Sequence, residues 1–206
     1  QYRIDPARIV LRGFSMGGAG AWHIGLHDPG RWGAVEAGAG FSDTIKYARL
    51  KEVPRHHRKA LHIYDAVDYS LNAFNVPTIG YGGEIDKQLQ ASVNIREALQ
   101  AGGFQFNKDG LNWKLDGLPS DGAAGLRAVF LVGPKSEHRF HPESRKISAA
   151  FIRKQLETRP AEPEELRFVT YTMRYNRCRW LQIKGLKEHL ARAEVRAVYK
   201  REKGRL

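Results

Sequence analysis

The chain has 206 residues, of which 42% are hydrophobic and 27% charged, a composition typical of a globular protein with one good core. It has a single cysteine and no long apolar stretch, which excludes an internal disulfide and a membrane-spanning segment. There is no Cys pair and no HExxH motif, so a zinc site has little support. We therefore predict no metal, no cofactor and no membrane attachment.

The formal net charge of +12 is unevenly distributed along the chain. Residues 151–206 hold 15 Lys and Arg against 7 Asp and Glu (+8), whereas residues 1–150 hold 19 against 15 (+4). A basic end of this kind suits a nucleic acid or an anionic surface. However, most of its arginines alternate with apolar residues, as on the solvated face of a strand, and no nucleic-acid-binding motif accompanies them. We expect no nucleic-acid partner.

The first elements are a short apolar strand over residues 9–13 and a helix over about 16–27, joined by Gly13-Phe14-Ser15-Met16-Gly17-Gly18. A G-x-S-x-G sequence between a strand and a helix indicates a sharp turn that strains the serine backbone and exposes its hydroxyl above the sheet. We expect the glycines at 13 and 17 to let the strand and the helix cross closely. Ser15 is the candidate nucleophile, and an ordinary Gly-Ser loop is the alternative.

A second strand is predicted over 34–40 and a third over 76–81. The polar segment 43–73 between them, broken by Pro54, reads as a cap or crossover outside the core. The third strand runs into Gly83-Glu84-Ile85-Asp86, ahead of an amphipathic helix at about 88–100. Asp86 is the first candidate for an acid that orients a catalytic base, and Glu84 is the alternate. Asp86 equally suits a cap of the following helix.

Residues 102–124 are rich in Gly and Asp and are expected to form an irregular loop. The apolar run 128–132 predicts a strand buried on both faces, and Pro142 opens a helix through about Leu156. Between this strand and this helix lie two histidines. His138, within the loop, is the candidate base, whereas His141 is the alternate or a helix cap. The pair has metal-ligand spacing, but no third ligand lies near it in the sequence.

Strands that alternate with helices indicate parallel βαβ units, so residues 1–158 are predicted to form a doubly wound α/β domain. The Pro- and Glu-rich residues 159–166 are predicted to be a linker. Three alternating stretches follow, at 168–173, 180–183 and 195–199, and we interpret them as antiparallel strands of a separate β-rich module over 167–206. Asn176-Arg177 is expected to turn the first pair. Three strands make a poor independent fold, so this module is expected to be partial.

The order of the three candidate residues along the chain is typical of nucleophilic catalysis. A serine hydroxyl needs a base to take its proton, and the base needs an acid to hold its tautomer and offset its charge. Ser15, Asp86 and His138 occur in the order serine, acid, histidine, each in a loop directly after a predicted strand. This order favours acyl transfer.

The chain resembles the α/β-hydrolase superfamily and, within it, the prolyl oligopeptidase-type serine peptidases and their esterase-like bacterial relatives. The resemblance covers about residues 1–157 and rests on Asp5-Pro6-Ala7-Arg8-Ile9 before the Ser15 motif, on Gly83-Glu84-Ile85-Asp86, and on Glu137-His138-Arg139-Phe140-His141-Pro142-Glu143. It implies the C-terminal half of a mostly parallel hydrolase sheet, with Ser15 as nucleophile, Asp86 as acid and His138 as base. It also implies that the N–H of Met16 belongs to the oxyanion hole.

Members of this family have about four strands before the serine turn, whereas here the turn strand begins near residue 9. We therefore expect the chain, which starts with Gln1, to be a piece that lacks those strands and the loop that completes the oxyanion hole. Such a piece is expected to fold poorly and to be nearly inactive alone. The stretch from Arg167 resembles a β-rich appendage of some large secreted bacterial members, which implies a secreted or periplasmic protein.

The predicted function is that of a serine hydrolase, a peptidase of prolyl oligopeptidase type, that acts on a peptide or ester substrate through an acyl-serine intermediate. A carboxylesterase of the same fold is one alternative. The other is a non-catalytic binding module with a basic β extension.

Overall fold

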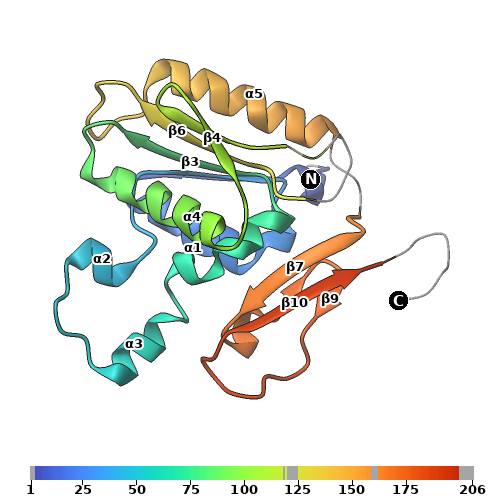
Figure 1. Cartoon of the computed structure of the whole chain (residues 1–206). Helices are drawn as coiled ribbons and strands as arrows, with labels where there is room; N and C mark the ends of the chain where they lie inside the picture. The colour runs from blue at the N-terminus through green and yellow to red at the C-terminus, as the bar shows by residue number, and fades with distance from the viewer. Residues whose placement is uncertain (1–2, 118, 120–124, 159–161, 200–206) are drawn as a thin grey trace.

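The computed structural model describes residues 3–117, 119, 125–158 and 162–199. Within them, six strands form one sheet in the order β1-β2-β3-β6-β5-β4 (Figure 1). These strands are β1 (Val10–Phe14), β2 (Ala34–Gly38), β3 (Thr78–Gly83), β4 (Phe106–Asp109), β5 (Asn112–Leu115) and β6 (Ala128–Gly133). The first three and β6 are parallel, and the β4–β5 hairpin joins β6 in antiparallel register. The predicted α/β class with a mostly parallel sheet is confirmed.

Helices cover both faces of this sheet (Figure 1). The helix α5 (Pro142–Thr158) lies on one face, and α1 (Met16–His27) and α4 (Gln90–Ala101) lie on the other. Strand β6 sends Val129 and Leu131 into the core under α5, whereas its Phe130 enters the opposite core. Because β6 is buried on both faces, it is apolar along nearly its whole length.

Two short helices, α2 (Thr44–Ala48) and α3 (Arg55–Leu61), lie outside these layers and bury no residue (Figure 1). For this part of segment 43–73 the predicted position outside the core is confirmed. The prediction is wrong for the 3₁₀ helix η3 (Ala66–Asn75), which is largely buried in the core with α1 and α4. Its polar side chains indicate a solvated segment, but they form hydrogen bonds to buried backbone groups instead. Asn72 donates to the carbonyl oxygens of Leu26 and Val169, at 2.8 and 2.9 Å.

The predicted irregular loop 102–124 is wrong over its centre, where β4 and β5 form a hairpin. Asp109 pairs with Asn112, so Gly110 and Leu111 make a two-residue turn. Gly110 has a φ of 59°, a conformation that favours glycine and is common at such turns. Residues 118 and 120–124 of the predicted loop lie outside the described residues.

The C-terminal part contains the antiparallel strands that the sequence predicted, but they pair differently. Strand β7 (Glu165–Thr170) pairs with β10 (Ala193–Val198), and the short β8 (Arg177–Cys178) pairs with β9 (Leu181–Gln182). The expected turn at Asn176-Arg177 between the first two stretches is therefore wrong. Strand β7 begins within the predicted linker 159–166, of which 159–161 lie outside the described residues.

This β-rich part contacts the α/β part through β7. The side-chain amide of Asn72 bonds to both the N–H and the carbonyl of Val169. Val169 and Tyr171 also share a hydrophobic core with Trp22 of α1. The two parts thus have a common core, and the division into a domain of 1–158 and a module of 167–206 stays a prediction. No helix among the described residues is long and apolar enough to cross a bilayer.

Candidate active site

The turn between β1 and α1 has the strained geometry that its sequence predicts. Ser15 precedes α1 with φ 60° and ψ −123°, a backbone conformation that costs a non-glycine residue about 1–3 kcal/mol. Its N–H donates to the carbonyl oxygen of Gly38 on β2 at 2.9 Å. The neighbouring strand therefore helps to hold the serine in this conformation.

Close packing at this turn depends on two glycines, of which only one was predicted. A Cβ on Gly13 would lie 1.9 Å from the carbonyl oxygen of Gly17, which confirms the expectation for Gly13. A Cβ on Gly17 would meet nothing within 4 Å, so the expectation for Gly17 is wrong. Gly18 has that role instead, because its Cβ would lie 2.1 Å from the carbonyl oxygen of Gly38. On α1 it is residue 18, not residue 17, that faces β2.

Asp86 lies in the loop after β3 and makes two kinds of contact at once. One carboxylate oxygen, Oδ2, lies 2.8 Å from Nδ1 of His138. The other, Oδ1, accepts a hydrogen bond from the N–H of Gln88 at 2.9 Å and so caps the 3₁₀ helix η4 (Lys87–Leu89). Asp86 thus caps η4, just ahead of the helix predicted at 88–100, and its role as the acid stays a prediction. The cap also fixes the carboxylate, which is only 6% exposed.

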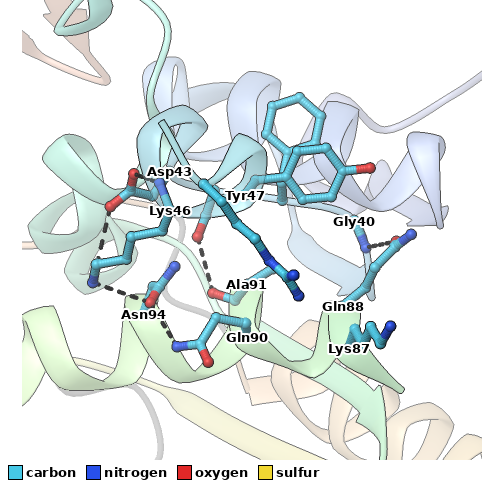
Figure 2. A pocket seen from close by; sticks show the side chains of 12 residues that line it. Gly40, Asp43, Lys46, Tyr47, Lys87, Gln88, Gln90, Ala91 and Asn94 are labelled. Carbon is cyan, nitrogen blue, oxygen red and sulfur yellow. Dashed lines mark hydrogen bonds and ion pairs between the residues drawn. The ribbon is translucent and has the colours of Figure 1, made fainter. Parts of the chain in front are cut away.

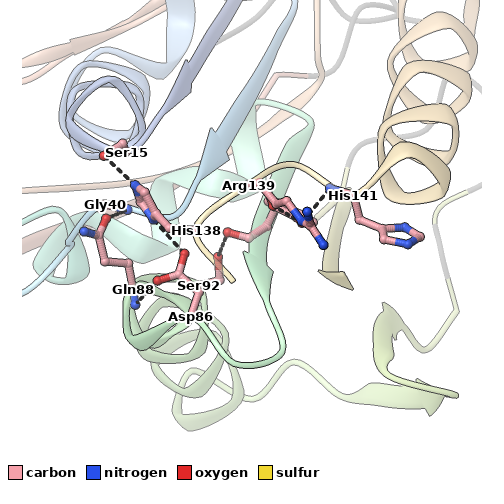
Figure 3. A network of polar contacts seen from close by, with 9 residues as sticks. Ser15, Gly40, Asp86, Gln88, Ser92, His138, Arg139 and His141 are labelled. Carbon is pink, nitrogen blue, oxygen red and sulfur yellow. Dashed lines mark hydrogen bonds and ion pairs between the residues drawn. The ribbon is translucent and has the colours of Figure 1, made fainter. Parts of the chain in front are cut away.

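His138 joins the other two groups. Its Nε2 lies 2.8 Å from Oγ of Ser15, and Figure 3 shows the serine, the imidazole and the carboxylate in one line of hydrogen bonds. A carboxylate only accepts hydrogen bonds, so Nδ1 carries the proton and Nε2 is free to accept from the serine hydroxyl. The ring of Phe14 packs against the imidazole at a centroid distance of 4.9 Å. We call this Ser15–His138–Asp86 arrangement the triad.

The alternates lie elsewhere. A carboxylate oxygen of Glu84 accepts from the N–H of Lys135 at 2.7 Å and so holds the loop that carries His138. His141 donates its backbone N–H to the Tyr81 hydroxyl at 2.8 Å, and its imidazole points away from Ser15 (Figure 3). Its carbonyl accepts from Arg145 in the first turn of α5. The structure does not bring Glu84 or His141 to the serine.

Met16, the expected oxyanion-hole residue, is the first residue of α1, and its side chain is exposed. An N–H in the first turn of a helix has no partner within the helix. In the described part of the chain, no group accepts a hydrogen bond from this N–H. It is therefore free to donate to an oxygen that develops negative charge beside Ser15.

Two supporting residues were missed by the sequence reasoning. The Tyr81 hydroxyl on β3 donates to the carbonyl oxygen of Arg139 at 2.7 Å and accepts from the N–H of His141, and thus ties the histidine loop to the sheet. Burial raises the pKa of Tyr81, which keeps the hydroxyl protonated as a donor. A tyrosine in a buried strand needs a partner for its hydroxyl, and this signal could have found it. Gln88 accepts from the N–H of Gly40 at 2.7 Å and was not predictable from local sequence.

A cavity of about 810 Å³ opens beside the triad, between the loop after β2, helix α2 and the start of α4 (Figure 2). The triad residues do not line the cavity, but two residues of its wall contact them (Figure 3). A Cβ on Gly40 would lie 2.6 Å from the carbonyl oxygen of Ser15, and the N–H of Gln88 donates to Oδ1 of Asp86 at 2.9 Å. Among the described residues, no three His, Cys, Asp or Glu side chains gather as metal ligands.

Comparisons with known proteins add little beyond these observations. No protein-family model matches the chain, and no curated protein matches it. Among solved structures, S-formylglutathione hydrolases from Staphylococcus aureus and Agrobacterium tumefaciens match with TM-scores of 0.45 and 0.46, at 14% and 20% identity. These matches cover 75% and 77% of this chain, and 54% and 52% of those chains.

A ferulic acid esterase matches with a TM-score of 0.42 at 14% identity, over 70% of this chain and 50% of that one. The chain thus spans about half the length of the solved structures that it matches. All three proteins are named as hydrolases or esterases, and none as a peptidase. The predicted resemblance to prolyl oligopeptidase-type peptidases stays a prediction.

Proposed function

We propose that the protein is a serine hydrolase that cleaves carboxylic esters through an acyl-serine intermediate. The observation that carries this proposal is the pair of 2.8 Å contacts of His138, one from Nε2 to the Ser15 hydroxyl and one from Nδ1 to the Asp86 carboxylate. The strained turn that presents Ser15 supports it further, because such strain persists where the surrounding structure requires it.

In the proposed reaction, His138 takes the hydroxyl proton while Oγ of Ser15 attacks the substrate carbonyl carbon. The negative charge that forms on the carbonyl oxygen is stabilised by the free N–H of Met16, and the charge on the imidazolium by Asp86. The imidazolium then gives its proton to the leaving oxygen, and the alcohol departs. Water, with His138 as base, next attacks the acyl-serine, which releases the acid and restores the serine.

Esters come before peptides in this proposal because of the leaving group. An alcohol or phenol leaves more readily than an amine, and therefore needs less protonation and less stabilisation of the transition state. The imidazole of His138 is 41% exposed, so the site excludes little water, and its charge stabilisation is correspondingly weaker than in a closed site. A peptidase of prolyl oligopeptidase type remains the second candidate.

Labelling with a fluorophosphonate tests the proposal directly. We expect the folded protein to be labelled and the Ser15→Ala variant not to be labelled. We also expect this substitution to lower the activity on p-nitrophenyl butyrate at least about 10⁴-fold. Ser70→Ala, a change in a buried serine of η3, is the matched control and is expected to keep both. Labelling that persists in Ser15→Ala, or a folded protein that is never labelled, would contradict the proposal. Turnover of ethyl butyrate against butyryl anilide separates esterase from peptidase.

A further inference from the structure

The cavity beside the triad carries more positive than negative charge. Three cationic side chains line it, those of Lys46, Arg49 and Lys87, against the one carboxylate of Asp43. The Asp43 carboxylate already has a partner, because it caps α2 by accepting a hydrogen bond from the N–H of Lys46 at 2.9 Å. Its other oxygen lies 3.9 Å from the ammonium of the same lysine, which also donates to Asn94 at 3.2 Å.

This pairing leaves two cations unmatched. Among the described residues, the side chains of Arg49 and Lys87 have no ion pair and no hydrogen bond. Figure 2 shows Asp43, Lys46 and Asn94 together at one side of the cavity and Lys87 at the other, next to Gln88 and Gly40. The uncompensated charge at Lys87 therefore lies on the side of the triad.

Arg49 occupies an unfavourable backbone conformation at this cavity. It ends α2 with φ 53° and ψ 40°, in the left-handed region where helices usually place a glycine. A residue with a side chain is strained there, and such strain is concentrated at functional sites. The arginine thus places a guanidinium at the cavity at a cost that a glycine would avoid.

Part of the remaining wall, which also contains Ser42, Gln88, Gln90 and Asn94, suits a carbon chain. The rings of Phe41 and Tyr47 stack at a centroid distance of 4.7 Å and line the cavity together with Ala91. A volume of about 810 Å³ is within the range of small-molecule sites. The cavity therefore combines an apolar patch with two free cations, and its wall contacts the backbone of Ser15 through Gly40.

We propose that this cavity selects esters whose acyl chain ends in a carboxylate, which Arg49 and Lys87 bind while the ester carbonyl lies at Ser15. A guanidinium matches a carboxylate with two parallel hydrogen bonds, and an ammonium adds a point charge. The substrate class is thus the monoester of a short dicarboxylic acid. This inference rests on the proposed function for the reaction, whereas the binding of the anion can be measured without it.

The first experiment compares two esters with acyl chains of equal length, mono-p-nitrophenyl glutarate and p-nitrophenyl pentanoate, in which a terminal carboxylate replaces a methyl group. We expect kcat/KM to favour the glutarate by at least 10-fold at low salt. In the double variant Arg49→Gln/Lys87→Gln the ratio is expected to fall to about one. The matched control, Lys146→Gln/Arg153→Gln, removes the same charge from exposed positions of α5 and is expected to keep the ratio. A ratio near one in the unaltered protein, or an equal fall in both variants, would overturn the inference.

The second experiment measures binding without hydrolysis, by calorimetry on Ser15→Ala with monomethyl glutarate and methyl pentanoate. We expect the anionic ester to bind at least 10-fold more tightly, and this advantage to shrink between 50 and 500 mM salt. Salt dependence needs no further variant, so the test survives if the double variant fails to fold. Equal affinities for the two esters would refute the inference.

The two experiments also separate the inference from the proposed function. Tight binding of monomethyl glutarate by a protein that is neither labelled nor active would refute the hydrolase and keep the anion site. Hydrolysis of both esters at equal rates would support the hydrolase and refute the anion site.

Discussion

The catalytic edge (residues 13–18, 83–86 and 133–141) carries the triad, whereas the rim (residues 43–65 and Lys87) supplies part of the cavity wall, and the two are held in different ways. At the edge, backbone packs directly on backbone. A Cβ on Gly83, for example, would lie 2.2 Å from the carbonyl oxygen of Glu137. At the rim, α2 and α3 bury no residue, and side chains make attachments to other segments, such as the hydrogen bonds from Lys46 to Asn94 and from Lys59 to Glu188.

This difference separates the groups that react from the groups that select. The reacting atoms need positions fixed to a fraction of an ångström, and close-packed backbone provides this. The rim contributes exposed side chains, which can change with little effect on the fold. We expect substitutions at the edge to be costly in activity or stability, and those at the rim to alter preference.

The largest effect is expected for Asp86→Asn. An amide can present its N–H to Nδ1 of His138 and so hold the wrong tautomer, which lowers kcat by about 10⁴-fold. Glu84→Gln makes the same chemical change in the same loop. Because Glu84 contacts the N–H of Lys135 and not the imidazole, we expect a loss below about 10-fold. Ester hydrolysis measures both, and equal losses would show that the acid has been misassigned.

The next largest effect concerns neighbouring glycines of α1. Gly18→Ala places a methyl group against the carbonyl oxygen of Gly38, which we expect to cost about 3 kcal/mol or more in unfolding free energy. Gly17→Ala meets open space and is expected to change stability by less than about 1 kcal/mol. Thermal or urea unfolding distinguishes the two. Similar destabilisation of both variants would mean that the helix packs on β2 differently.

A smaller effect is expected for Tyr81→Phe, which removes both hydrogen bonds between β3 and the His138 loop. The carbonyl of Arg139 and the N–H of His141 lose their partner, at a cost of about 1–3 kcal/mol. We expect kcat to fall about 10-fold, because the imidazole is held less firmly. Tyr69→Phe deletes a buried hydroxyl of η3, far from the loop, and is the control with unchanged kcat. A loss of stability without a change in kcat would limit Tyr81 to a structural role.

The smallest effect is a pH dependence at the boundary between the rim and the core. Burial raises the pKa of Asp65 to about 6, against the hydrogen bonds from Thr44, which favour the charged form. This group therefore contributes stability that is fully present below about pH 4 and is lost as the pH rises through 6. Asp65→Asn stays neutral and keeps an oxygen acceptor for Thr44. Its stability relative to the unaltered protein is expected to rise by about 1 kcal/mol between pH 4.5 and 7.5.

Urea titrations at several pH values measure this difference. A constant difference between the two proteins across that range would show that Asp65 is charged throughout. If the difference has the opposite sign, the hydrogen bonds from Thr44 outweigh burial.

Some elements of the fold could be predicted because they depend on the residue types of a short segment of the chain. The strand, serine turn and helix at 9–27 follow from an apolar run and small residues, and the double burial of β6 follows from its unbroken apolar stretch. The hairpin at Gly110 was missed although its turn glycine was visible, because the surrounding Gly- and Asp-rich composition favoured a loop. The buried η3 was missed because Asn72 and Asn75 look solvated, whereas both bond to the backbone of β7.

By itself, the sequence determined which residue types follow which strands, and in what order along the chain. Parallel strands end at one edge of their sheet, so the loops after β1, β3 and β6 had to converge there. Only the tertiary structure decided which histidine meets Ser15 and which carboxylate meets that histidine. It also decided which glycine faces β2 and which strand pairs with β7. These choices depend on register and on the direction of side chains between distant segments, whereas a local pattern reports only the preferences of its own backbone.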